Sequence, residues 1–311
     1  MVLLLAAGCG SSVSRSTIMV IPRDTAEEVW VSEHGGAVDA ALKHRLRIYW
    51  NGPSGYDDVE QQIALIERAV AGHYYGLIVS PNNSFALSNA IESALSSGMP
   101  IVITSEEVSI APQAGLFFVL NDAKQMGALA AQRMNAILKG KGTVAILGLD
   151  AVSPGMVERA NAFEQNLHQI APQIKVVAKV AAPYNFGQAE LAAEQILRAY
   201  PGLAGIFSLG NNYTMGAVAA VHSVAPPHPV HIVGCDQLLD SLLLLRRGEL
   251  DALVVEDTRT MGYRAVEEIA AQRAGHPGPP RVLVEPVLVD RENVNDAAIQ
   301  QILSVRWRPQ Q

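Results

Sequence analysis

The sequence predicts an α/β protein with two lobes, each built on a doubly wound, mostly parallel sheet. Short runs rich in β-branched residues and bounded by Gly, Pro or Asn recur along the chain, which is typical of buried parallel strands. Segments with apolar residues at helical spacing lie between most of these runs, and such an alternation indicates βαβ units. The 311 residues are enough for about two domains. About ten units are too many for one small open sheet, so we expect two sheets of five or six strands.

The predicted strands divide into two successive groups. The first group comprises residues 17–21, 47–50, 76–80, 100–104 and 116–120. The second comprises residues 143–149, 176–181, 205–209, 231–234 and 253–255. Helical spacing of apolar residues covers 59–70, 126–138, 160–167, 191–197 and 261–271.

The last third of the chain contains a further extended run, residues 281–289, with Pro286 inside it. A proline cannot donate to a ladder of hydrogen bonds, so this run suits an edge strand or a crossover between the lobes. We therefore expect a chain that passes between the lobes several times. The N-terminal lobe is predicted to hold residues 17–121 with 257–285, and the C-terminal lobe residues 122–256 with 286–305. Residues 306–311 would form a tail.

Composition excludes several classes of protein. Lys and Arg number 23 against 30 Asp and Glu, a net charge of −7, whereas nucleic-acid binders usually carry a basic face. The hydrophobic fraction of 49% and the charged fraction of 17% exclude a disordered chain. Two cysteines exclude a disulfide scaffold and a cysteine zinc site. No run approaches the roughly 18 apolar residues of a membrane helix.

The N-terminal residues 1–16 are predicted to be the remnant of a lipoprotein signal followed by a tether. The run Leu5-Ala6-Ala7-Gly8-Cys9 resembles a lipobox, in which Cys9 would be lipidated and become the mature N-terminus. A signal peptide also needs a positive n-region, and the first basic residue here is Arg15, so we expect the true start to lie upstream. The alternative is a frayed apolar end with a chance cysteine.

Polar side chains follow nearly every predicted strand. Because the carboxyl ends of parallel strands meet at one edge of a sheet, ligands of such folds bind there. Carboxylates, amides and guanidinium groups can bind adjacent sugar hydroxyls in pairs, and Trp30 offers a flat face to a sugar ring. Alternatively, some of these residues only cap the following helices. The candidate ligand-binding residues are Arg23, Glu27, Trp30, Ser80, Ser105, Glu106, Asn121, Arg159, Tyr184, Asn211, Asp236 and Glu256.

The order and spacing of several short motifs resemble those of the type I periplasmic substrate-binding proteins of the ribose and galactose class, in lipoprotein form. The resemblance covers roughly residues 17–289, and no single motif is specific by itself. The matching segments are TIMVI (17–21) followed by Trp30, GLIVSP (76–81), GMPIV (98–102), Asp122 with Gly127, Glu158-Arg159 ahead of Phe163, IF (206–207) with Asn211 and Gly216-Ala217, VGCD (233–236) and GEL (248–250).

This resemblance implies two Rossmann-like lobes that close about a multi-segment hinge around one small ligand in the cleft between them. The chain would then be the substrate-binding component of an ABC importer, a monomer without cofactor or metal, anchored in the periplasm and partnered by the permease subunits. By position, Asp236 and Arg159 would bind hydroxyl groups, Trp30 would stack on the ring, and Asn121 and Glu256 would lie near the hinge. Arg23, Glu27, Ser80, Ser105 and Tyr184 fall at other ligand-facing positions.

The departures from the family pattern indicate a pocket unlike that of a ribose binder. Ser105-Glu106 replaces an Asp-Arg pair, Cys235 stands where an aromatic is common, and Gly210 stands where an asparagine is. Glu27, Glu106 and Glu256 make the pocket more acidic, with Arg23 and Arg159 as counter-charges. The expected ligands are therefore a sugar, a polyol, an amino-sugar or a cationic molecule.

Three other functions remain open. A ligand sensor or chemoreceptor partner without transport would show the same sequence. A repressor-like effector domain would need a DNA-binding headpiece, and the 16 residues before the first strand are too few and too rich in serine. A hydrolase would need a nucleophile motif, and the sequence has no G-x-S-x-G, P-loop, G-x-G-x-x-G or H-E-x-x-H pattern in the required context. We expect the histidines to be surface or capped residues and Cys235 to be an inert buried thiol.

Overall fold

A computed structural model describes residues 15–55, 58–151, 153–236, 238–305 and 307. The chain forms two compact units. The first takes in the residues up to Leu120, Thr258–Val282 and the end of the chain from Val305. The second consists of Asn121–Asp257 and Leu283–Ser304, so the chain passes between the units four times. The predicted Cys9 lipidation site lies outside the described residues.

The first unit contains a six-stranded sheet in the order β11-β5-β4-β3-β1-β2. Its first five strands along the chain pair in parallel, so their carboxyl ends share one edge. β1, β3 and β5 are fully buried runs of mostly apolar residues, as expected of a covered parallel sheet, whereas the edge strand β2 is partly exposed. The strands are β1 (Thr17–Ile21), β2 (Arg47–Trp50), β3 (Gly76–Val79), β4 (Ile101–Ser105), β5 (Leu116–Asn121) and β11 (Arg281–Val284).

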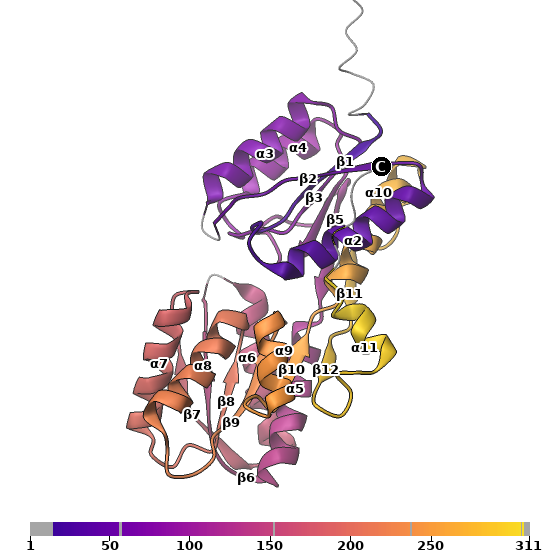
Figure 1. The fold of residues 1–311 in the computed structure, drawn as a ribbon. Coiled ribbons are helices and arrows are strands. Elements are labelled where there is room, and N and C mark those ends of the chain that lie inside the picture. Colours follow the sequence, from indigo (N-terminus) through magenta and orange to yellow (C-terminus); the bar gives the residue numbers. More distant parts are fainter. Residues whose placement is uncertain (1–14, 56–57, 152, 237, 306, 308–311) are drawn as a thin grey trace, which may run out of the picture. The chain divides into compact units, whose positions relative to one another are not determined.

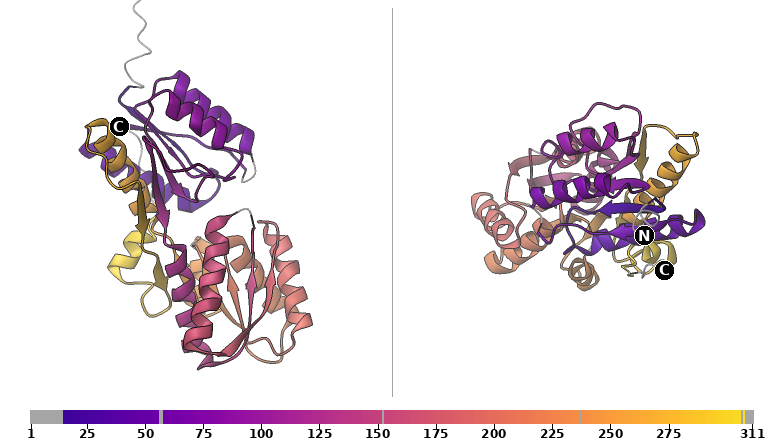
Figure 2. Two further views of the ribbon diagram at one scale, coloured as in Figure 1. Left: turned by 180° about the vertical axis from the view of Figure 1, so that it is seen from behind. Right: turned by 90° about the horizontal axis from the view of Figure 1, so that it is seen from above.

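Four helices cover the two faces of this sheet. The helices α3 (Val59–Ala71) and α4 (Ser88–Ser96) pack on one face, where Ile66 and Ile91 meet Leu77 and Ile103. The helices α2 (Glu28–Lys43) and α10 (Thr258–Arg273) cover the other face (Figure 1, Figure 2). α10 comes from the end of the chain and closes a face that the first 120 residues leave open.

The second unit repeats this plan with the order β12-β10-β9-β8-β6-β7. Its strands are β6 (Lys141–Leu147), β7 (Gln173–Val180), β8 (Gly205–Ser208), β9 (His231–Cys235), β10 (Ala252–Val255) and β12 (Val287–Val289). All pair in parallel except β12, which runs antiparallel to β10 at the edge. Its helices are α5 (Ala123–Leu138), α6 (Pro154–Ile170), α7 (Phe186–Ala199), α8 (Asn211–Val224), α9 (Leu239–Arg247) and α11 (Ala297–Ile302).

These observations confirm the predicted fold class: two α/β units, each with a mostly parallel sheet. One element differs from its predicted form. The extended run 281–289 is broken before Pro286, and its two halves, β11 and β12, join different sheets. The proline lies between the halves, where no ladder hydrogen bond is required of it.

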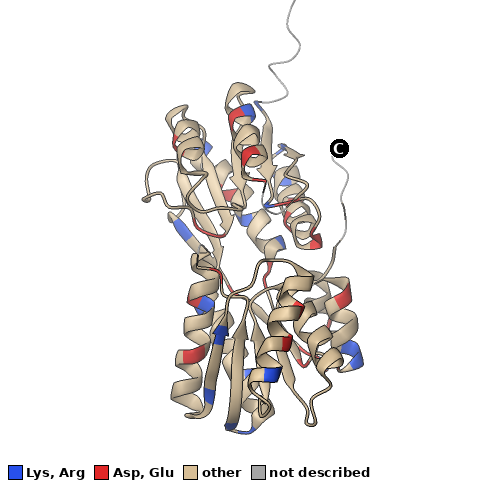
Figure 3. Cartoon of the chain, turned by 90° about the vertical axis from the view of Figure 1, so that its left-hand side faces the viewer, with Lys and Arg blue, Asp and Glu red and all other residues tan. Residues whose placement is uncertain are grey.

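Acidic and basic residues are interspersed over the helices of both units in the view of Figure 3. Over the part of the chain that the structure describes, this view therefore shows no single basic face of the kind that nucleic-acid binders usually carry. Among the helices of the described residues, none combines the length and the apolar character that crossing a membrane requires.

Glycine allows the closest helix contact in the second unit. A Cβ atom at Gly127 of α5 would stand 2.3 Å from the backbone oxygen of Arg159 and 2.7 Å from the backbone nitrogen of Phe163, both on α6. The two helix backbones therefore touch at a point where no side chain fits. Gly187 in α7 is a contrast, because its nearest neighbour would be a side-chain atom at 3.5 Å.

We predict opposite effects for the same substitution at these two glycines. Gly127→Ala should lower the free energy of unfolding by roughly 1–3 kcal/mol, because the helices must move apart. Gly187→Ala should leave that free energy unchanged or raise it by up to about 1 kcal/mol, because alanine restricts the unfolded chain and favours helix. Urea unfolding followed by circular dichroism measures both, and equal effects at the two sites would contradict the packing described here.

Candidate functional site

In the first unit, one aspartate fixes two candidate residues after β1. Asp24 Oδ1 accepts hydrogen bonds from the backbone nitrogens of Ala26 (2.8 Å) and Glu27 (2.9 Å). Asp24 Oδ2 accepts a hydrogen bond from Trp30 Nε1 at 3.3 Å. Trp30 is only 4% exposed, so its ring has one orientation. Asp24 is a positioning residue that the sequence analysis missed; an Asp two residues before a backbone donor is the only local signal of it.

Arg23 joins the loops after β1 and β3. Its Nε donates a hydrogen bond to the backbone oxygen of Pro81 at 3.1 Å, and its Cζ lies 5.9 Å from the centre of the Trp30 ring. The guanidinium group is thus held against an aromatic face, which favours a cation. Arg23 and Trp30, two of the predicted residues, are therefore brought together at the carboxyl edge of the first sheet.

Ser80 is fully buried and uses its hydroxyl within the protein. Its Oγ donates to Glu33 Oε2 at 2.9 Å and shares a hydrogen bond with Thr104 Oγ1 at 2.8 Å. Glu33 is 1% exposed, and its carboxylate links α2 to Ser80 at the end of β3, which in turn bonds to Thr104 of β4. The sequence analysis missed Glu33, because its partner Ser80 is 47 residues away and no spacing rule joins them. The hydroxyl of Ser80 holds the strand ends in place, and a direct contact with ligand stays a prediction.

Two candidate residues occupy strained positions at equivalent strand ends. Ser105 ends β4 with φ +64°, and Asp236 follows β9 with φ +64°. β4 and β9 occupy the same place in the two sheets. A left-handed backbone is uncommon for residues other than glycine and is often found at functional sites. The backbone nitrogen of Glu106 donates a hydrogen bond to the backbone oxygen of Thr104 at 2.8 Å, which closes the turn around Ser105. Glu106 as a residue is 9% exposed.

At the end of β5 and after β7, two adjacent polar residues have different roles: the second residue caps the next helix, and the first does not. Asp122 caps α5 by accepting a hydrogen bond from the Gln125 nitrogen at 2.9 Å. Asn121, which ends β5, is 8% exposed, and neither its amide oxygen nor its amide nitrogen has a hydrogen-bond partner among the described residues. Asn185 likewise caps α7, while Tyr184 before it stands edge-on to Tyr213 with ring centres 5.3 Å apart. Capping thus accounts for the second residue of each pair only.

A buried ion pair lies at the carboxyl edge of the second sheet. Arg159 of α6 donates from Nη2 to Glu256 Oε1 at 2.7 Å and from Nη1 to the backbone oxygen of Leu209 at 2.8 Å. The two charged side chains are 4% and 10% exposed. Loss of water costs both ions free energy, so such pairs persist where geometry and further hydrogen bonds compensate. The pair fixes α6 to the ends of β8 and β10.

The other candidates of the second unit lie around Gly210. A Cβ atom at Gly210 would stand 3.2 Å from a ring carbon of Tyr184 and 3.7 Å from Asp236 Oδ2, so these two side chains approach the glycine. Asn211 is 3% exposed, and both atoms of its amide lack hydrogen-bond partners among the described residues. The second sheet therefore gathers Arg159, Glu256, Tyr184, Asn211 and Asp236 at one edge, as predicted from the parallel topology.

Cys235, between these groups, is chemically quiet. Burial raises the pKa of its thiol to about 12, although the Arg159 guanidinium group opposes this shift. The thiol is therefore protonated at neutral pH, and a protonated thiol is a poor nucleophile. Within the described ranges, no three His, Cys, Asp or Glu side chains gather as metal ligands would.

One histidine differs from the surface role that we expected of all of them. His34 on α2 is fully buried, and neither ring nitrogen has a hydrogen-bond partner among the described residues. Its ring stacks on Trp307 with centres 4.2 Å apart and meets the edge of Trp50 at 5.9 Å. Burial lowers the pKa of His34 to about 4. No local pattern in the sequence indicated this burial, because the aromatic side chains that cover His34 come from distant parts of the chain.

A family model and a relative that match this chain are both described as binding proteins. The family described as "Periplasmic binding protein domain" matches residues 18–277. The ribose import binding protein RbsB of Bacillus subtilis (strain 168) is 25% identical over 213 residues, which cover 68% of this chain and 67% of that protein.

Two solved structures show the same fold. A carbohydrate transporter solute binding protein from Agrobacterium radiobacter, in complex with D-arabinose, has a TM-score of 0.85 and 25% identity and covers 94% of this chain and 100% of its own. A periplasmic solute binding protein of an ABC transporter from Actinobacillus succinogenes 130z, with bound D-allose, has a TM-score of 0.80 and 27% identity. That match covers 89% of this chain and 98% of the other.

We predict that His34 makes stability depend on pH. Its pKa is lower in the folded protein than in the unfolded chain, where it is about 6.5. The free energy of unfolding is therefore highest above pH 6.5 and falls as the pH drops toward 4, because only the unfolded chain binds the proton. His34→Phe should flatten this part of the profile, and His276→Phe, at an exposed position, should not. Urea unfolding at pH 7, 5.5 and 4.5 makes the comparison, and a profile unaltered by His34→Phe would contradict the assignment.

Proposed function

The chain belongs to the periplasmic binding protein family, and on that premise we propose that it is the substrate-binding component of an ABC importer for a small sugar-like ligand. The proposed ligands are a sugar, a polyol or an amino-sugar. One observation carries the proposal most directly. The buried amides of Asn121 and Asn211 have no hydrogen-bond partner in the part of the chain that the structure describes, and buried polar groups are nearly always satisfied. A ligand with several hydroxyl groups supplies the donors and acceptors that these amides require.

The residues around these amides support the same ligand class. Trp30 is buried and rigid, and a flat indole suits the C–H face of a sugar ring. Asp236 provides carboxylate oxygens that accept hydrogen bonds from hydroxyl groups in pairs. The two similar solved structures named above hold D-arabinose and D-allose. In the second unit Glu256 is neutralised by Arg159, which favours an uncharged ligand over a cationic one.

We propose that the ligand takes hydrogen bonds from strand-end residues of both units. A ligand that contacts both binds the closed state more tightly than the open one, and this difference in affinity drives closure. The permease subunits of the importer would then recognise the closed form. The family implies a location in the periplasm or outside the cell, and its described relatives are binding proteins rather than enzymes.

A thermal-shift screen of residues 11–311 tests the ligand class. The panel should hold pentoses, hexoses, polyols, amino-sugars, nucleosides and amino acids. A ligand at about 100 times its Kd adds about 2.7 kcal/mol to the free energy of unfolding, which is readily measured. Stabilisation by nucleosides or amino acids alone, or by no compound, would contradict the proposed sugar-like ligand.

We predict that Asp236→Asn removes most of the affinity for the ligand found by this screen. Asparagine tolerates the left-handed backbone at this position, so the fold is kept while the charged acceptor is lost. Loss of a hydrogen bond to a charged group costs about 1.5–3 kcal/mol, or roughly tenfold to a hundredfold in Kd. Asp236→Ala should bind no better.

Isothermal titration calorimetry measures this loss. Asp240→Asn, an exposed carboxylate in the first turn of α9, serves as the matched control and should bind like the wild type. Wild-type affinity in Asp236→Asn with an unchanged melting temperature would remove Asp236 from the proposed site.

We further propose that Cys9 anchors the protein to the membrane through a lipid. Acyl chains on a cysteine bind a bilayer without any spanning helix. In cells that express the chain behind a complete lipoprotein signal, Cys9→Ser should move the protein from the membrane fraction to the soluble periplasmic fraction. The unchanged chain provides the control, and a Cys9→Ser protein that stays with the membranes would rule out this anchor.

A further inference from the structure

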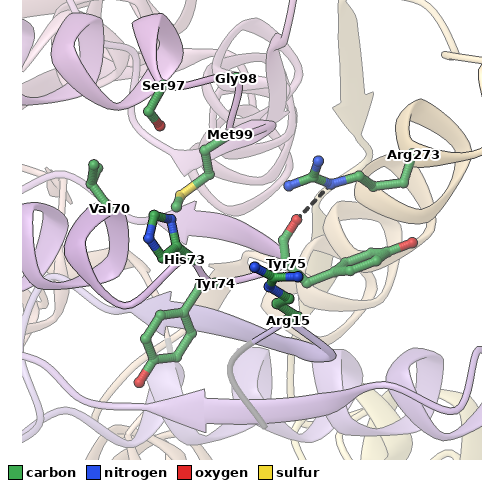
Figure 4. A pocket seen from close by; sticks show the side chains of 9 residues that line it. All are labelled: Arg15, Val70, His73, Tyr74, Tyr75, Ser97, Gly98, Met99 and Arg273. Carbon is green, nitrogen blue, oxygen red and sulfur yellow. Dashed lines mark hydrogen bonds between the residues drawn. The ribbon is translucent and has the colours of Figure 1, made fainter. Parts of the chain in front are cut away.

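The first unit has a hollow at the amino ends of its strands, the opposite end from the candidate residues described above. Its volume is about 390 Å³, which lies in the range of small-molecule pockets. Arg15 precedes β1, Tyr75 directly precedes β3, and Met99 precedes β4. His73 and Arg273, at the ends of α3 and α10, complete this polar hollow (Figure 4).

Arg273 is held firmly in the hollow. Its Nε donates to the backbone oxygen of Tyr75 at 2.8 Å, and its Cζ lies 5.3 Å from the centre of the Tyr75 ring. These contacts occupy the inner edge of the guanidinium group and leave the two terminal nitrogens for another partner. Figure 4 shows the side chains of Arg15 and Arg273 both extending toward the middle of the lining residues.

The two arginines share the hollow without an acidic residue. None of the residues that line it is Asp or Glu, and neither Arg15 nor Arg273 pairs with a carboxylate of the described residues. Six other arginines do form such pairs: Arg133, Arg159, Arg198, Arg247, Arg259 and Arg281. In a chain with seven more acidic than basic residues, two converging cations without an acid leave an excess of positive charge that an anion would balance.

A histidine adds a further polar side chain to the hollow. His73 follows α3 in the left-handed conformation that commonly ends a helix, with φ +50° and the Tyr74 nitrogen donating to the Ala69 oxygen at 3.2 Å. Its imidazole lines the hollow. Arginine forks match the oxygens of a phosphate group in pairs, and imidazole adds a further donor. The volume leaves room for an organic group beside the phosphate.

We propose that this hollow binds a phosphate ester, with Arg15 and Arg273 bound to the phosphate oxygens. The ester could be supplied by a soluble phosphorylated metabolite or by a phospholipid headgroup, and both present the same group to the arginines. The site is separate from the sugar-like site, so it stands or falls independently of the proposed function.

The test uses the full chain with Cys9→Ser, so that no lipid anchor contributes to membrane binding. Isothermal titration calorimetry with glycerol 3-phosphate measures the soluble source, and flotation with phosphatidylglycerol vesicles, against phosphatidylcholine vesicles, measures the headgroup source. Arg15→Gln and Arg273→Gln should each weaken the binding that is observed by about tenfold or more. Arg246→Gln, an exposed arginine on α9, should not change it.

Each outcome decides the proposal. Binding of glycerol 3-phosphate that both variants weaken supports a soluble ligand, and binding to phosphatidylglycerol vesicles alone that both variants weaken supports a headgroup. Arg15 is exposed, so its variant keeps the test valid should Arg273→Gln unfold the protein. Binding of neither probe, or binding that a folded Arg15→Gln or Arg273→Gln variant leaves unchanged, would overturn the proposal.

Discussion

Parallel pairing of the strands is the constraint from which the rest of the structure follows. It requires a crossover between parallel strands, which is usually a helix, so it produces the layered units and covers both faces of each sheet. It also places the carboxyl ends of the parallel strands of each sheet at one edge. Residues far apart in the sequence, such as Arg159 and Glu256, become neighbours there because they follow or face strand ends, and no local interaction brings them together.

The same constraint explains why some polar residues at these edges cap helices while their neighbours do not. A strand end must release its chain into a helix, and the helix requires a cap for its free backbone nitrogens. Asp122 and Asn185 meet that requirement. Their predecessors Asn121 and Tyr184 do not take part in this capping. Asn121 ends β5, and Tyr184 lies in the loop between β7 and α7. A ligand site can therefore be added to such a fold without loss of helix caps.

The sequence predicted those features that depend on repeating patterns. Apolar runs placed the strands, and helical spacing placed five of the ten helices of the described residues. Topology then predicted the edge at which Asp236 and Arg159 lie. Features that depend on tertiary contacts were missed. Glu33 of α2 bonds to Ser80 at the end of β3, and the ring of His34 stacks on Trp307 from the end of the chain and meets the edge of Trp50. None of these contacts leaves a spacing signal, since the partners are distant in sequence.

The pairing of Arg159 with Glu256 reduces the negative charge that the acidic residues were expected to give the candidate site. From sequence, Glu256 added negative charge to the pocket. In the structure its carboxylate and the guanidinium group lie 2.7 Å apart, so together they present a dipole rather than a charge. Either residue alone would be an uncompensated buried charge, and the pair must therefore be kept or replaced as a unit. A buried, neutralised edge of this kind discriminates between ligands by the positions of their hydroxyl groups, because each hydrogen bond is stronger where water is excluded.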